Sequence, residues 1–181
     1  MKNLLIREAK DSDLPDVLSV ERAAFGQEEE AELVEKLLAD PSAQPSLSLL
    51  AFLDDCAVGH ILFTKARLIE PQNAISVVLL APLAVVPDTQ RQGIGGKLIA
   101  KGIELLSAAH VDLIFVLGHP SYYPRHGFRP AGQFGLDAPY PMPAEQDDAW
   151  MVQALRPDMI ENVRGKVLCA DALNRPEYWH E

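Results

Sequence analysis

Hydrophobic and polar positions along this chain follow two different periods, which predicts a protein built from both strands and helices. Apolar residues at helical spacing predict helices starting after Asp11 or Ser12, over Glu28–Ala39 and over Gly93–His110. Short apolar or alternating runs predict strands at Leu4–Ala9, Ser46–Leu53, Ala57–Leu68, Ala74–Val86, Leu113–Leu117 and Trp150–Leu155, with another beginning at Phe128. With a short helix in 118–126, the order is β-α-α-β-β-β-α-β-α-β, a mixed α/β sheet with helices on both faces.

Two of these segments carry more specific expectations. Ala74–Val86 is apolar on both faces, so it should be a central, buried strand. Pro82 inside it cannot donate a hydrogen bond to a neighbouring strand, which predicts a bulge or a splayed strand edge. On the helix over Gly93–His110, the expected buried stripe is Ile94, Leu98, Leu105 and Ala109.

Composition narrows the classes of protein. The 181 residues fit one domain, 1–181, in which the apolar residues of 156–181 make a packed C-terminal extension. A net charge of −10 argues against nucleic-acid binding, and two cysteines argue against a disulfide scaffold or a thiolate zinc site. The longest apolar run, Val77–Val86, is too short for a bilayer, and the N-terminus turns charged early. We therefore expect a cytoplasmic protein with no metal and no membrane segment.

The most informative segment is the glycine-rich helix start that follows the central strand, Gly93-Ile94-Gly95-Gly96-Lys97. The first turn of a helix has free N–H groups and a positive dipole end, and glycines let a phosphate approach them. A Walker A loop needs Ser or Thr where Leu98 stands, and a dinucleotide fingerprint needs a third glycine at the same position. The segment is therefore weak evidence for the dinucleotide site of an NAD-dependent oxidoreductase.

The segment instead resembles the acyl-CoA site of the GNAT superfamily, the Gcn5-related N-acetyltransferases. Its signature, Gln/Arg-x-x-Gly-x-Gly/Ala, is matched by Gln90, Gly93 and Gly95. The family's Tyr-x-x-x-Gly-Phe is matched by 123–128, and the opening 6–9 is also typical. The stretches 116–123 and 139–143 look like a small bacterial branch of N-acetyltransferases.

The resemblance implies a GNAT-like fold, in which a mixed, mostly antiparallel sheet is splayed between two parallel strands. It also implies acetyl-CoA as cosubstrate and direct acetyl transfer to a primary amine in a ternary complex, with no metal needed. No covalent acyl-enzyme is expected, because Cys56 falls in a predicted hairpin turn and Cys169 in the tail. Tyr123 is then the general acid that protonates the leaving thiolate, with Tyr122 as its rival. The residues implied to hold acetyl-CoA are Leu83, Ala84, Val85, Gln90, Arg91, Gln92, Gly93, Ile94, Gly95, Gly96, Lys97 and Tyr122.

The missing general base leaves the function open. Many relatives carry a glutamate on or beside the central strand as general base, but Ala74–Val86 has no acidic residue. The glutamates at 28–30 and 32 are expected to be a solvated helix start, and His60 a hydrogen-bonded structural histidine, so no base is assigned. A non-enzymatic acyl-CoA-binding sensor of the same fold is the alternative. The resemblance also implies a homodimer through the C-terminal strand and tail; the acceptor amine is not determined.

Overall fold

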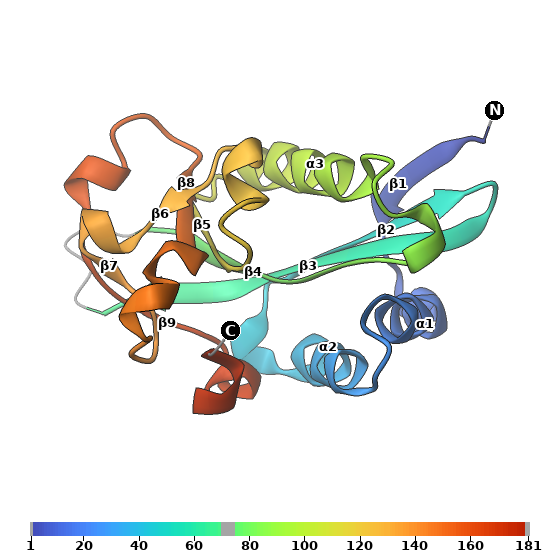
Figure 1. The fold of residues 1–181 in the computed structure, drawn as a ribbon, viewed down its shortest axis with the longest axis horizontal. Helices are drawn as coiled ribbons and strands as arrows, with labels where there is room; N and C mark the ends of the chain where they lie inside the picture. Colours follow the sequence, from blue (N-terminus) through green and yellow to red (C-terminus); the bar gives the residue numbers. More distant parts are fainter. Residues whose placement is uncertain (1, 70–74, 180–181) are drawn as a thin grey trace.

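A nine-stranded mixed sheet forms the middle of the molecule in the computed structural model, which describes residues 2–69 and 75–179 (Figure 1). Its strands are β1 (Leu4–Glu8), β2 (Leu47–Leu53), β3 (Cys56–Leu68), β4 (Val77–Val85), β5 (Leu113–Leu117), β6 (Arg129–Pro130), β7 (Leu136–Asp137), β8 (Trp150–Ala154) and β9 (Gly165–Leu168). The α-helices are α1 (Leu14–Phe25), α2 (Glu29–Ala39) and α3 (Ile94–Ala108). Short 3-10 helices include η1 (Asp11–Asp13) and η4 (Tyr123–His126).

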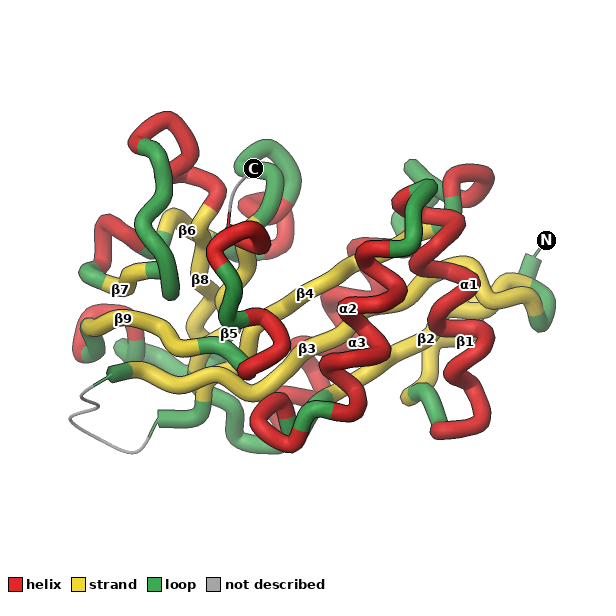
Figure 2. The backbone as a smooth tube through the Cα atoms, turned by 90° about the horizontal axis from the view of Figure 1, so that it is seen from below, coloured by secondary structure: helices red, strands yellow, loops and turns green. Residues whose placement is uncertain are grey.

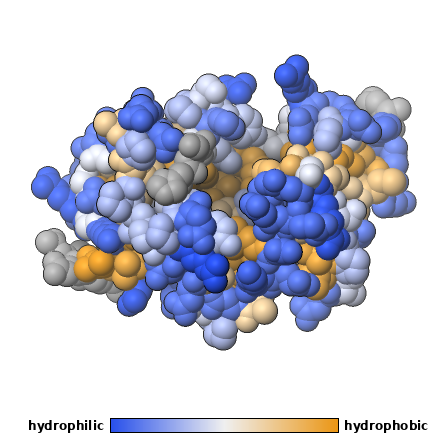
Figure 3. Space-filling view, turned by 60° about the horizontal axis from the view of Figure 1, so that its bottom comes forward, coloured by the Kyte–Doolittle hydropathy of each residue, from blue (hydrophilic) through white to orange (hydrophobic). Residues whose placement is uncertain are grey.

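The strands lie in the order β1-β2-β3-β4-β5-β8-β6, and along this path every neighbouring pair is antiparallel except β4 and β5. The long strand β3 reaches past this path, where its end pairs with β9, which in turn runs parallel to β7. The predicted mixed, mostly antiparallel sheet is confirmed, and among the described strands β4–β5 and β7–β9 are the parallel pairs. Figure 2, seen from below, shows the long strands β3 and β4 running behind α1 and α2. On this lower side, hydrophilic residues with apolar ones between them make up the surface (Figure 3).

Helices cover both faces of the sheet, as the element order predicts: α1 and α2 lie on one face and α3 on the other (Figure 1). Successive residues of a strand point to opposite faces, so neighbours such as Leu49 and Leu50 enter different cores. Leu50 packs with Val17 and Val34 from α1 and α2. Leu49 packs in the other core, with Leu98 of α3.

The buried stripe of α3 differs from the prediction. Ile94 and Leu98 are buried, but the stripe continues through Gly102 and Leu106 rather than through Leu105 and Ala109. A Cβ added to Gly102 would lie 2.5 Å from the Phe63 ring, so the missing side chain is what lets the helix approach the sheet there. A hydrophobic pattern does not count glycine as apolar. It therefore predicted the wrong buried face for α3.

Other element boundaries were also missed. The described part of the central strand begins at Val77, and residue 74, where the prediction began, lies outside the described residues. The four-residue strand β9 was not predicted, because its pairing depends on distant β3 and β7 rather than on a strong local pattern. Within residues 2–69 and 75–179, no helix is both long and apolar enough to cross a membrane.

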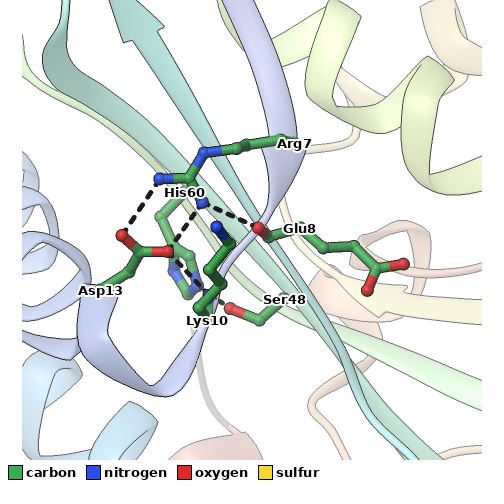
Figure 4. Close-up of polar contacts among 6 residues, drawn as sticks. All are labelled: Arg7, Glu8, Lys10, Asp13, Ser48 and His60. Atoms are coloured by element: carbon green, nitrogen blue, oxygen red, sulfur yellow. Dashed lines mark hydrogen bonds and ion pairs between the residues drawn. The ribbon is translucent and has the colours of Figure 1, made fainter.

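The first helix starts later than predicted, after a 3-10 turn, and an ion pair holds that turn against β1. Arg7 donates to both carboxylate oxygens of Asp13, at 2.7 and 3.1 Å, and the Lys10 backbone N–H donates to the same carboxylate at 2.7 Å (Figure 4). The hydrogen bonds from Arg7, the larger cause, and from the Lys10 N–H lower the pKa of the Asp13 carboxyl to about 2. Asp13, rather than Asp11 or Ser12, therefore organises the start of the helix.

We predict that Asp13→Asn destabilises the protein at neutral pH but makes little difference in acid. Because the folded-state pKa of Asp13 is depressed, its contribution is present above the unfolded-state pKa and is lost as the pH falls through about 2. Urea unfolding of the wild type and the variant at several pH values from neutral to acid measures the difference, with Asp11→Asn as a matched surface control. A stability difference independent of pH would contradict the assignment.

Candidate active site

The two parallel strands at the centre of the sheet separate part-way along their length. Their pairing ends at Leu80 and Val116, yet β4 continues to Val85. After β5 the chain stays with its other neighbour, since the Gly118 N–H donates to the Ala149 carbonyl. The register between β3 and β4 also shifts opposite Pro82, which confirms the predicted irregularity. The edge of 81–85 that faces away from β3 is thus left for an extended ligand to pair with.

The start of α3 lies at the end of this strand. After the turn at Pro87–Thr89, the side-chain amide of Gln90 donates to the Val85 carbonyl at 2.9 Å and ties the loop to β4. Gly93 caps the helix with a φ of 83°, a left-handed conformation that glycine adopts without strain. The Lys97 N–H makes the first i→i−4 bond, to Gly93, so the preceding N–H groups are available to an anion.

Two glycines of the first helical turn are in close contact with Tyr122, just before η4, and with His126, the last residue of η4. A Cβ on Gly95 would lie 2.6 Å from the Tyr122 hydroxyl oxygen and 3.6 Å from Leu83. A Cβ on Gly96 would lie 2.8 Å from the His126 ring. The structure therefore brings together a residue of β4, the glycine-rich helix start and Tyr122, which are far apart in the sequence.

The remaining residues implied to hold acetyl-CoA have distinct surroundings. Leu83 and Val85 pack on the α3 side of the sheet, whereas Ala84 is buried on the α1 side. The Ile94 side chain is in the core, so only its backbone can face a ligand. Gln90, Arg91 and Gln92 of the loop and Lys97 of α3 are exposed. Their two positive charges stand beside the helix start on an otherwise acidic protein.

Tyr122 and Tyr123 meet edge to face, with ring centroids 5.1 Å apart. Tyr123 is only 8% exposed and lies against Gly118, at the end of β5, and against Phe128. Burial raises the pKa of Tyr122, while the nearby Arg125 acts in the opposite direction. One tyrosine thus lies on the helix start and the other at the end of β5.

A second polar group, only partly foreseen, lies on the opposite face of the sheet. The His60 Nδ1 lies 2.7 Å from a carboxylate oxygen of Glu21, and Nε2 lies 2.8 Å from the Ser48 hydroxyl. Glu21 and His60 are fully buried, and burial raises the pKa of the Glu21 carboxyl. His60 is hydrogen-bonded, as the sequence predicts, but Glu21 and Ser48 were missed. A glutamate three and four residues after apolar Leu18 and Val17 was the available signal.

Comparison with known proteins identifies the family. Residues 5–131 match the model of the acetyltransferase (GNAT) domain. The chain belongs to the GNAT acetyltransferase family. The uncharacterized N-acetyltransferase YjhQ of Escherichia coli K12 is 49% identical over 161 residues, covering 88% of each chain. A crystal structure of E. coli YhbS, a GNAT family N-acetyltransferase in complex with CoA, matches with a TM-score of 0.87 and 28% identity, over 97% of this chain and 94% of that one.

A second solved structure, a GNAT family acetyltransferase from Brucella melitensis in complex with acetyl-CoA, matches with a TM-score of 0.73 and 30% identity. It covers 94% of this chain and 98% of its own. These relatives place this GNAT chain among the N-acetyltransferases, as the resemblance of its motifs implies. The predicted fold and enzyme class are confirmed.

We predict that truncating Glu21 destabilises the protein more than truncating Ser48 does. Glu21→Ala removes a carboxylate from the core and leaves His60 Nδ1 unpaired, which should cost about 3 kcal/mol of unfolding free energy. Ser48→Ala removes a half-buried hydroxyl and should cost about 1 kcal/mol. Urea unfolding measures both, and Glu32→Ala, at an exposed helical glutamate, is the control. Similar losses of unfolding free energy in Glu21→Ala and Glu32→Ala would show that the buried Glu21–His60 pair does not stabilise the protein.

Proposed function

We propose that this GNAT protein transfers an acetyl group from acetyl-CoA to a primary amine by direct attack within a ternary complex. The observation that carries the proposal is the free backbone edge of β4 at 81–85, which ends beside the glycine-rich start of α3. An extended arm can pair with such an edge while its phosphates reach the helix N-terminus. The CoA in E. coli YhbS and the acetyl-CoA in the Brucella protein support the same ligand here.

The parts of the ligand are assigned to different residues of the chain. The pantetheine arm pairs with the backbone of Leu83–Val85, and the pyrophosphate lies on the N–H groups of 92–97. Arg91 and Lys97 supply positive charge to the phosphates. Tyr122, next to Gly95 and Leu83, lines the path between the two parts.

The reaction then needs few groups from the protein. The amine nitrogen attacks the thioester carbon, and a backbone N–H of β4 stabilises the negative charge that develops on the carbonyl oxygen. As the C–S bond breaks, Tyr123 gives its proton to the CoA thiolate. The amine loses its own proton to water, because the described part of β4 carries no acidic side chain. Two substrates bound together make an acyl-enzyme unnecessary.

A cavity of about 700 Å³ beyond β5 supports a cationic acceptor. Trp150, which pairs with Leu117 at the end of β5, is part of its wall, as is Tyr140. The carboxylates of Asp137, Asp147 and Asp148 also line the cavity and outnumber the lysine among its lining residues, Lys166. Carboxylates and aromatic rings both attract a protonated amine or a second cationic group of the acceptor. We therefore expect a diamine, which carries a second cationic group, to be a better acceptor than a monoamine.

Isothermal titration with acetyl-CoA, CoA, NAD and ATP tests the ligand, and a panel of primary amines with a thiol-detecting reagent then tests transfer. We expect selective binding of acetyl-CoA and thiol release that depends on the amine and is fastest with diamines. Binding without transfer to any amine would instead favour the sensor function, consistent with the missing acid on β4. Failure of folded protein to bind any CoA species would refute the site.

The helix start gives a prediction for binding. Gly95→Ala places a methyl group 2.6 Å from the Tyr122 hydroxyl oxygen and pushes that side chain away from its place beside Leu83. Alanine is the better helix former, so the fold should survive, but acetyl-CoA should bind about 10-fold more weakly, or about 1.4 kcal/mol. Gly132→Ala, where an added Cβ has open space, is the matched control. Wild-type affinity in Gly95→Ala would exclude close approach of the ligand.

The two tyrosines are separated by kinetics. Tyr123→Phe should lower kcat by about 100-fold, because it removes the proton donor, while the Kd for acetyl-CoA stays nearly constant. Tyr122→Phe should weaken acetyl-CoA binding and leave kcat nearly unchanged, since that hydroxyl lies against the helix start. Steady-state rates give kcat for both variants, and titration gives their Kd for acetyl-CoA. The reversed pattern would make Tyr122 the general acid.

A further inference from the structure

The buried polar group described above has the arrangement of a carboxylate, an imidazole and a hydroxyl in line. The Glu21 carboxylate lies 2.7 Å from Nδ1 of His60, and the other ring nitrogen, Nε2, lies 2.8 Å from the Ser48 hydroxyl oxygen. The three residues come from α1, β3 and β2 and are separated in the sequence by 39 and 12 positions. Figure 4 shows the His60 ring and the Ser48 side chain side by side on their neighbouring strands.

Each of these two hydrogen bonds indicates a chemical role for the residues that it joins. A carboxylate on Nδ1 holds the proton of the neutral imidazole there, so Nε2 is left to accept the hydrogen bond of the serine hydroxyl. A base in this state can remove the hydroxyl proton when the oxygen attacks an electrophile. Glu21 and His60 have no exposed surface, so their electrostatic interaction is screened less than it would be in water. The other Glu21 oxygen has no hydrogen-bond partner among the described residues.

The hydroxyl end of the line opens on a cavity. Ser48 is half-buried and lines a cavity of about 440 Å³, a volume that holds a small molecule. Leu14 and Leu38, from α1 and α2, form apolar parts of its wall, and Lys10 brings a positive charge. Carboxylates of Glu8, Asp11 and Glu35 also line this cavity and disfavour substrates that carry a carboxylate of their own. The line thus runs from a closed interior to an open, ligand-sized space.

We propose that Ser48 is the nucleophile of a second catalytic site, which hydrolyses small neutral or cationic carboxylic esters, with His60 as its base. This site differs from the proposed acetyl-CoA site in place and chemistry. Ser48 lies on β2, two strands away from β4, and its partners lie on the face covered by α1 and α2. The start of α3, where the phosphates of acetyl-CoA are proposed to bind, is on the other face.

The proposed reaction proceeds in two balanced steps. Ser48 Oγ forms a bond with the ester carbonyl carbon, and its proton passes to His60 Nε2. The bond to the alcohol then breaks, and the alcohol leaves with that proton, so Ser48 carries the acyl group. Water attacks the acyl-serine, its proton passes through His60, and the carboxylic acid and free Ser48 are restored. Glu21 stabilises the imidazolium in both steps, and Lys10 can stabilise the charge that develops on the carbonyl oxygen.

A fluorophosphonate probe tests the nucleophile directly, because the oxygen of an activated serine displaces fluoride from its phosphorus, loses its proton to the base and becomes a phosphonate ester. We expect the intact, folded protein to be labelled, and peptide mass spectrometry to place the label on Ser48. Ser48→Ala should abolish the labelling. Ser46→Ala removes another hydroxyl of the same cavity and should leave it unchanged. Absence of label on Ser48 in folded wild-type protein would overturn the proposal.

Hydrolysis of p-nitrophenyl acetate gives the second readout. We expect a burst of p-nitrophenol followed by slower turnover, and a rate about 100-fold lower in Ser48→Ala and in His60→Gln. Glu21→Gln, a positioning change, should slow the burst while the protein stays folded by circular dichroism. The anionic p-nitrophenyl hemisuccinate should react more slowly than the acetate. Undiminished hydrolysis in Ser48→Ala would refute the site, and no acetyl-CoA is present, so the result is independent of the proposed acetyl transfer.

Discussion

Much of the structure depends on the fact that β4 continues where β5 has already left it. The pairing of these two parallel strands stops at Leu80 and Val116, and β4 extends to Val85 with a partner only on the β3 side. In a protein interior, unpaired peptide groups are costly, so an exposed edge of this kind is kept only where a ligand or solvent can satisfy it. Pro82 lies within this edge, where its missing N–H costs least.

The same constraint positions the helix start. A strand that ends free of its neighbour can turn directly into the loop that begins α3, and Gln90 fixes that loop by its bond to the Val85 carbonyl. The backbone edge and the positive end of the helix dipole are therefore adjacent by chain connectivity. On the other face, the interior carries a polar line through Glu21, His60 and Ser48. Burying a carboxylate there is destabilising unless the imidazole compensates, which is why these two residues depend on each other.

The features predictable from the sequence were those set by local chemistry. The order of the elements, the central strand and the glycine-rich helix start followed from hydrophobic period and turn residues. The missed features depend on contacts between distant segments. Strand β9 has only four residues and exists through its pairing with β3 and β7, and the face of α3 was decided by the space that Gly102 leaves for Phe63. No local pattern contains that information.

The tyrosine pair shows where spacing and geometry contribute separately. The family resemblance, counted from Gly127, implies Tyr123 as the general acid, but the spacing does not say what either hydroxyl contacts. In the fold, Tyr122 lies on Gly95 of the helix start, and the Tyr123 ring lies on Gly118, just after β5 ends. Gly95 and Gly118 lie near the place where β4 and β5 separate. Because neither has a side chain, Tyr122 fits against Gly95 and Tyr123 fits against Gly118. The two rings pack edge to face on the α3 side of the sheet, and the proposed reaction needs a proton from only one of them.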